Sequence, residues 1–98
     1  MTSKQRAYLR SLANNINPIF QIGKSGISNN LIKQLDDALE ARELIKISVL
    51  ETAPDDIKAL AEDISTHTNS LLVQILGSKI TLYRAKKDNP KIHIPKYN

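Results

Sequence analysis

The apolar positions of this chain recur with two different periods, and each period predicts a type of element. A spacing of three and four residues, which gathers side chains on one face of a helix, occurs in three stretches. These stretches predict helices at about residues 3–14, 28–42 and 52–67. Their apolar faces consist of Leu9, Leu12, Ala13 and Ile16, then of Leu31, Ile32, Leu35, Ala38 and Leu39, and last of Ile57, Leu60, Ala61 and Ile64.

Polar residues at the expected helix starts support these boundaries. Thr2 with Gln5 three residues later is typical of a capping box, and Ser28 or Asn29 can cap the second helix. Asp55 and Asp56 favour the start of the third helix, because the positive end of the helix dipole attracts carboxylates.

Shorter apolar runs between the helices predict strands. Residues 19–22 form a buried run, and residues 44–50 alternate between apolar and polar. Residues 71–76 and 79–84 flank Gly77-Ser78 and predict an antiparallel hairpin. The order α-β-α-β-α-β-β predicts a single α/β (α+β) domain with a four-stranded mixed sheet, in which the two strands joined by the second helix are parallel. Residues 86–98 form a basic tail that either adds a short edge strand or trails in solvent.

Composition narrows the class of protein. The chain has 98 residues, enough for one domain, and its 41% of hydrophobic residues can build a modest core. It has no cysteine, so disulfides and thiolate metal sites are excluded. We also expect no signal peptide and no membrane span, because no apolar run approaches the length of about 20 residues that a span needs. The expected location is the cytoplasm.

The charged residues are separated along the chain. Residues 1–35 carry a net charge of +5 without any acid, residues 36–63 carry −6, and residues 64–98 carry +5. This separation predicts a dipolar molecule with a basic face made from its two ends, suited to an anionic partner. The alternative is that the charges only keep the protein soluble.

The sequence Gly23-Lys24-Ser25-Gly26 joins the first predicted strand to the second predicted helix. Two glycines let the backbone approach an anion closely, and a helix N-terminus adds unpaired N–H groups. A nucleotide-binding P-loop is excluded, because Pro18 stands where that motif needs a glycine. What remains is a GxxG sequence, the spacing with which one class of RNA-binding module clamps a nucleic-acid backbone. A plain turn is the alternative.

The chain resembles the CRM domain (chloroplast RNA splicing and ribosome maturation) family in its bacterial stand-alone form, the YhbY type. The resemblance runs from about Thr2 to Pro95 and rests on segments in the family's order. These are Lys4-Gln5-Arg6 with Leu9 to Ala13, Pro18 to Ile27 including the GxxG loop, Glu43 to Lys46, Ile75-Leu76-Gly77 and Leu82-Tyr83-Arg84. The chain departs from the family at Asn14, where a histidine is frequent.

The resemblance implies an RNA-binding protein that contacts large-subunit ribosomal RNA precursors during ribosome assembly. It also implies a fold similar to the C-terminal domain of translation initiation factor three. We assign Gly23 and Gly26 to close backbone approach, Lys24 to a phosphate and Ser25 to a hydroxyl hydrogen bond. Flanking basic residues extend the predicted RNA-binding site, namely Arg6, Arg10, Arg84, Lys86 and Lys87.

Other functions receive less support from the sequence. His67 and His93 stand apart, without the spacing of a zinc site or a nearby nucleophile, so we expect no enzyme, metal or cofactor. The rival function is a protein–protein adaptor that uses the acidic middle segment, with the GxxG sequence only a turn. A binder of small phosphate compounds is a third alternative. The few aromatic residues do not predict a base-stacking platform, and we expect Phe20 and Tyr83 to pack in the interior.

Overall fold

The computed structural model describes residues 1–95. It contains seven elements in the predicted order, each within two residues of its expected position except at the start of the third helix. They are α1 (Ser3–Ala13), β1 (Phe20–Ile22), α2 (Asn29–Arg42), β2 (Leu44–Val49), α3 (Ile57–His67), β3 (Leu71–Leu76) and β4 (Lys79–Tyr83). Helix α3 begins only at Ile57, because the Asp56 side chain caps it by accepting a hydrogen bond of 2.8 Å from Ala59 N.

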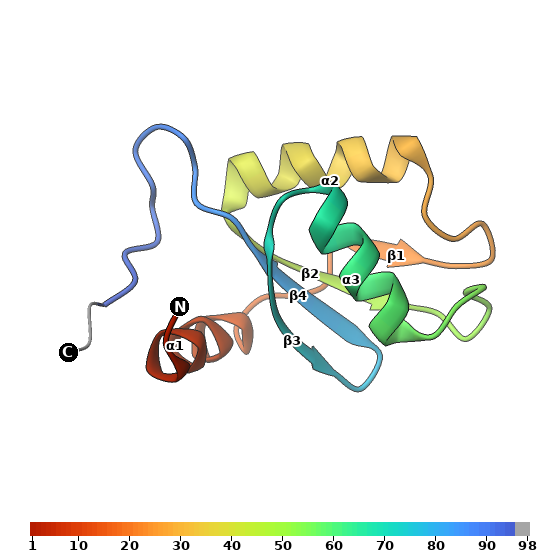
Figure 1. Cartoon of the computed structure of the whole chain (residues 1–98), viewed down its shortest axis with the longest axis horizontal. Helices are drawn as coiled ribbons and strands as arrows, with labels where there is room; N and C mark the ends of the chain where they lie inside the picture. Colours follow the sequence, from red (N-terminus) through yellow and green to blue (C-terminus); the bar gives the residue numbers. More distant parts are fainter. Residues whose placement is uncertain (96–98) are drawn as a thin grey trace.

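The four strands form one mixed sheet in the order β1-β2-β4-β3 (Figure 1). Strand β1 is parallel to β2, and the other two pairings are antiparallel. The predicted α+β domain with a four-stranded mixed sheet is therefore confirmed. Because β1 pairs on one side only, its outer edge belongs to the border of the sheet.

The two faces of the sheet carry different coverings. Helices α2 and α3 lie on one face, over a core that includes Ile45 and Ile47 of β2 and Ile80 and Leu82 of β4. The alternate residues of the same strands point to the opposite face, as the two-residue period of a strand requires. On that face α1 covers only one end, where its Leu9 and Ala13 pack in a second cluster with Leu44, Val73 and Tyr83.

Glu43 corrects an expectation from the sequence. Its spacing from Asp36, Asp37 and Glu40 predicts an exposed helix face, yet Glu43 is fully buried. It caps α2 with a positive φ of 69°, which turns the chain straight into β2 and carries its side chain inward. Helical spacing fails here because the residue lies just past the end of the helix.

The buried Glu43 carboxylate holds the C-terminal tail. Its two oxygens accept hydrogen bonds from the backbone N–H groups of Lys86 at 3.2 Å, Lys91 at 2.5 Å and Ile92 at 2.9 Å. Farther along, Gln5 Nε2 of α1 donates to Pro95 O at 3.1 Å. Residues 84–95 form no strand but run back across the α1 end of the molecule, where Ile92 and Ile94 pack against the second cluster. The last part of the predicted tail, 96–98, lies outside the described residues.

Candidate functional site

The GxxG loop lies directly between β1 and α2. Gly26 N donates to Gly23 O at 2.9 Å, which closes a tight turn around Lys24 and Ser25. Gly26 has φ +66°, and a Cβ built on it would lie 2.9 Å from Pro54 Cγ. Gly23 is less constrained, since a Cβ there would meet Leu50 Cδ1 at 3.3 Å. The second glycine is therefore required by both backbone conformation and space.

Donor groups gather at this loop. Lys24 and Ser25 are exposed, and within residues 1–95 their backbone N–H groups have no hydrogen-bond acceptor. Helix α2 begins three residues after Gly26, and Ser28 caps it by accepting from Leu31 N at 3.0 Å. The first N–H groups of a helix have no intrahelical acceptor, and they mark the positive end of its dipole. The loop therefore presents free N–H groups and one ammonium to solvent.

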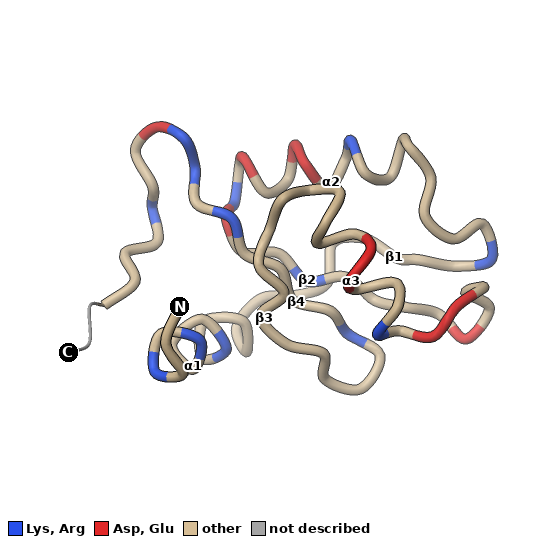
Figure 2. Tube along the Cα trace, viewed as in Figure 1, with Lys and Arg blue, Asp and Glu red and all other residues tan. Residues whose placement is uncertain are grey.

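An acidic loop borders the GxxG loop on one side. The contact between Gly26 and Pro54 brings the connection between β2 and α3 against it, and this connection contains Glu51, Asp55 and Asp56. Figure 2 shows acidic positions on this connection at the same end of the molecule as the GxxG loop. An anion therefore meets a favourable potential from the side of β1 and α2 and an unfavourable one from the side of residues 51–56.

The two arginines of α1 are placed differently. Arg10 is exposed. Arg6 is partly buried, and its guanidinium donates to the carbonyl oxygens of Leu72 at 2.6 Å and Val73 at 3.4 Å in β3. Arg6 therefore anchors α1 to an edge strand, while Arg10 leaves its charge available at the surface.

Arg84 also has partners within the chain. Its guanidinium binds the Asp36 carboxylate, the Asp36 carbonyl oxygen at 2.9 Å and Thr68 O at 2.7 Å, and lies 3.8 Å from Glu40 Oε1. It thus joins β4 to α2 and to the end of α3. Lys86 is partly buried near Glu43, and Lys87 is exposed, with its backbone N–H donating to Glu40 Oε2 at 3.3 Å.

The predicted site residues separate into two groups in space. The GxxG loop between β1 and α2 lies at one end of the longest dimension of 42 Å, and α1 and the tail lie toward the other end (Figure 1). The two basic ends of the sequence therefore do not gather around the GxxG loop. What joins the two groups is the chain from α1 through β1, which runs along the border of the sheet into the loop (Figure 1).

The half of the sheet that α1 leaves uncovered carries residues that the sequence reasoning did not select. Lys46 of β2 lies opposite Thr81 of β4, and Ser48 lies opposite Lys79. Gln21 of β1 continues this second row. The alternation in residues 44–50 already places Lys46 and Ser48 on the face opposite Ile45 and Ile47. That signal was sufficient to identify them as a polar sheet face.

Burial affects the pKa of two side chains, Glu43 and Tyr83. Burial by itself raises the pKa of Glu43, but the N–H donors of Lys86, Ile92 and Lys91, with the charge of Lys86, outweigh it and hold that pKa below 4.5. Burial raises the pKa of Tyr83 above 10.0, and the negative charge of Glu43 adds to the effect. Tyr83 packs in the second cluster, as expected, and is not placed to stack on a base.

Other sites find no support among residues 1–95. No group of three or more potential metal ligands occurs in this range, and none of its helices is long and apolar enough to cross a membrane. His67 is exposed at the end of α3, where its Nδ1 lies 3.3 Å from the Asp63 carboxylate.

Comparison with known proteins identifies similar chains of the same length. The family described as the CRS1 / YhbY (CRM) domain matches residues 1–84. A Bacillus subtilis (strain 168) protein named "Probable RNA-binding protein YqeI" is 47% identical over 95 residues, 97% of this chain and 99% of that protein. A Haemophilus influenzae protein named "RNA-binding protein" is 28% identical and covers 98% of this chain and 96% of its own length. The solution structure of a hypothetical protein from Staphylococcus aureus has a TM-score of 0.80 at 59% identity, covering 97% of this chain and 99% of that one.

Proposed function

Since the chain belongs to the CRS1 / YhbY (CRM) domain family, we propose that it binds RNA through the GxxG loop. In this proposal Lys24 pairs with a phosphate, the N–H groups of the loop donate to phosphate oxygens, and Ser25 adds a hydroxyl hydrogen bond. Gly23 and Gly26 have no side chains, so the RNA backbone can approach the protein backbone closely. The protein acts by binding and not by catalysis.

The observation that carries the proposal is the set of uncommitted donors at the loop. Lys24 and Ser25 are exposed, and their N–H groups have no acceptor in residues 1–95. Phosphate contacts of this kind give affinity without reading sequence, and they release counterions. Exposed Arg10 and Lys87 strengthen the binding from the other end of the molecule, while Arg6, Arg84 and Lys86 act mainly through their position in the fold.

We further propose that the RNA is a large-subunit ribosomal RNA precursor, and that the protein acts in the cytoplasm during ribosome assembly. Sedimentation of cell extracts tests this part separately. The protein should travel with precursor particles of the large subunit and less with mature ribosomes. If it remains in the fractions of free protein, the assembly role fails although RNA binding can still hold.

The adaptor function finds less surface available than its sequence suggests. Asp36, Glu40 and Glu43 of the acidic segment bind Arg84 or the backbone of the tail. These carboxylates therefore already have partners within the molecule. A basic protein partner would have to compete with Arg84 and the tail for these carboxylates, or bind the remaining acidic residues.

The test is RNA binding across a salt series for the wild type, Lys24→Glu and Lys58→Glu. Lys58 is an exposed lysine of α3 outside the proposed site, so its variant controls for the change in net charge. We expect Lys24→Glu to weaken binding and to reduce the slope of log K against log salt by about one unit. Lys58→Glu should keep a slope close to that of the wild type.

Equal affinities and slopes for the two variants would overturn the clamp. The GxxG sequence would then be only a turn. Absence of salt-dependent RNA binding by the wild type would overturn the proposed function as a whole.

A further inference from the structure

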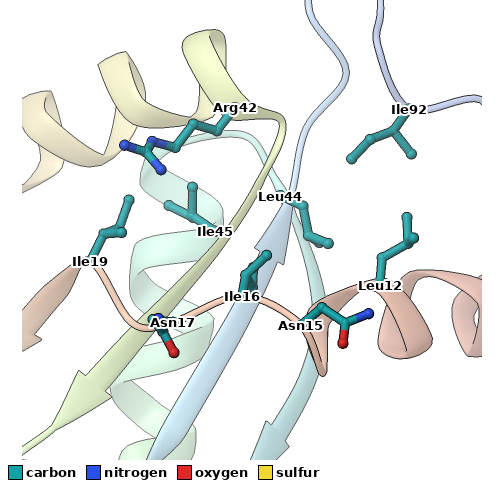
Figure 3. Close-up of a pocket in the computed structure, with 9 residues that line it drawn as sticks. All are labelled: Leu12, Asn15, Ile16, Asn17, Ile19, Arg42, Leu44, Ile45 and Ile92. Carbon is teal, nitrogen blue, oxygen red and sulfur yellow. The ribbon is translucent and has the colours of Figure 1, made fainter.

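A hollow of about 360 Å³ opens between the end of α1, the start of β1, the end of α2 and the tail (Figure 3). We call it the linker pocket. Its aliphatic lining comes from Leu12, Ile16, Ile19, Leu44, Ile45 and Ile92. Its volume lies within the range of about 300–1,000 Å³ that is typical of small-ligand sites.

Three residues with planar polar side chains complete the lining, namely Asn15, Asn17 and Arg42. Figure 3 shows Arg42 extending over Ile19 and Ile45, with Asn17 below them and Asn15 farther along the segment that joins α1 to β1, near Leu12. Within residues 1–95 these three side chains have no hydrogen-bond or ion-pair partner. Asn15, Asn17 and Arg42 are exposed, so their donors and acceptors are available to a ligand.

We propose that the linker pocket holds one unstacked nucleobase of the RNA. A base has two apolar faces, which suit aliphatic walls and a guanidinium plane, and a polar edge, which suits a carboxamide. The lining contains no carboxylate, and its one charge is positive, so the pocket accommodates an anionic strand. An apolar peptide side chain would use the walls but would make no hydrogen bond to the three polar side chains.

The position of the pocket supports this occupant. Ile19 also lines a second, open hollow with Pro18, Phe20, Gln21 and Ser48, which follows β1 toward the GxxG loop. From Ile19 to Gly23 an extended chain spans about 13 Å. An RNA strand with one base in the linker pocket can therefore run along the border of the sheet and place a phosphate at the GxxG loop. This inference rests on the proposed RNA binding and adds base recognition to it.

The tail forms part of the same pocket. Ile92 is a wall residue, and its N–H group donates to the Glu43 carboxylate at 2.9 Å. Glu43 is therefore a positioning residue, since it touches no RNA in this proposal but fixes one wall.

The test compares labelled single-stranded RNA heptamers of A, C, G or U, and heptamers that lack one central base, by fluorescence anisotropy. Wild-type protein should prefer one base and should lose about 10-fold in affinity when that base is removed. The double variant Asn15→Ala/Asn17→Ala should bind all heptamers alike while keeping the wild-type salt slope. Arg42→Lys keeps the positive charge but removes the planar guanidinium, so it should also lower the preference for one base.

The matched control is Asn14→Ala, since Asn14 is an exposed neighbour that does not line the pocket. It should retain the base preference. ¹⁵N-edited NMR should show the side-chain amides of Asn15 and Asn17 shifting on RNA addition, and backbone spectra verify that each variant is folded.

The proposal is overturned if the heptamers lacking a base bind as well as the intact ones, or if Asn15→Ala/Asn17→Ala keeps the base preference. It is also overturned if removing residues 96–98 shifts the two amides without RNA, because the chain's own end would then occupy the pocket. In all three cases a salt slope lowered by Lys24→Glu would leave the proposed function standing.

Discussion

At the scale of single residues, the backbone conformations of Gly26 and Glu43 shape the GxxG loop and the end of α2. Both have positive φ values, of 66° and 69°. Glycine takes that conformation without steric cost, whereas an L-residue such as glutamate strains the backbone there. Glu43 is maintained at this position by its three backbone hydrogen bonds to the tail.

Gly26 and Gly77 provide a matched pair for measuring the contact behind the GxxG loop. Both have positive φ, but only at Gly26 would a Cβ meet the Pro54 ring. We expect Gly77→Ala to lower the free energy of unfolding by about 1 kcal/mol through backbone strain alone. Gly26→Ala should cost more, by about a further 1 kcal/mol. Chemical denaturation measures both, and equal losses would show that the loop with Pro54 moves aside freely.

At the scale of elements, the fold is secured by links between segments that are far apart in the sequence. Arg84 connects β4 with α2 and the end of α3, Arg6 connects α1 with β3, and Glu43 connects the end of α2 with the tail. The sequence predicted Arg6 and Arg84 as RNA-binding residues but did not predict their hydrogen bonds within the chain. Periodicity describes one element at a time, so it does not reveal which charged side chains meet across elements.

The link from Glu43 to the tail should depend on pH. Its pKa is held below the ordinary value, so it stabilises the fold above about pH 4.5, and that stabilisation is lost as the pH falls through the folded-state pKa. Glu43→Gln should lower stability at pH 7 by about 2 kcal/mol, because charged hydrogen bonds to partly buried N–H groups are lost. It should also flatten the fall in stability on acidification.

Thermal unfolding from pH 3 to pH 7 measures both effects of Glu43→Gln. Asp37→Gln is a suitable comparison, since Asp37 is an exposed acid of α2. It should remain close to the wild type throughout. If the wild type and Glu43→Gln lose stability in parallel below pH 5, the carboxylate does not carry the expected pH dependence.

At the scale of the whole molecule, the basic residues do not gather on one face, and acidic residues lie beside the GxxG loop. Basic residues occur toward both ends of the long axis, and the acidic connection 51–56 lies beside the GxxG loop (Figure 2). The positive net charge of +4 attracts an anionic polymer from a distance. The acids near the loop then restrict the side from which it can approach.

Removing two of those acids should therefore strengthen RNA binding. We expect Glu51→Gln and Asp55→Asn each to raise the affinity about 2-fold at low salt, and less at high salt, where the repulsion is screened. Asp56 is left unchanged because it caps α3. Glu62→Gln on α3 removes the same charge at another place. If it raises the affinity equally, only net charge matters and the approach side is not restricted.

The sequence by itself determined the order and the type of every element, and with them the mixed sheet. These follow from periodicity, caps and turns, which act over a few neighbouring residues. It also placed the GxxG loop between β1 and α2, because a loop is adjacent in the chain to the elements that it joins. Gly26 needed no tertiary information to be recognised as a turn residue.

Only the tertiary structure decided which polar side chains are available to a partner. It engaged Arg84 and Arg6 within the fold, buried Glu43, and left Arg42, Asn15 and Asn17 around an aliphatic hollow. Each of these outcomes depends on contacts between segments that lie 16 or more residues apart in the sequence. The physical reason is that burial and hydrogen-bond partners are set by packing between elements, which no local pattern in the sequence encodes.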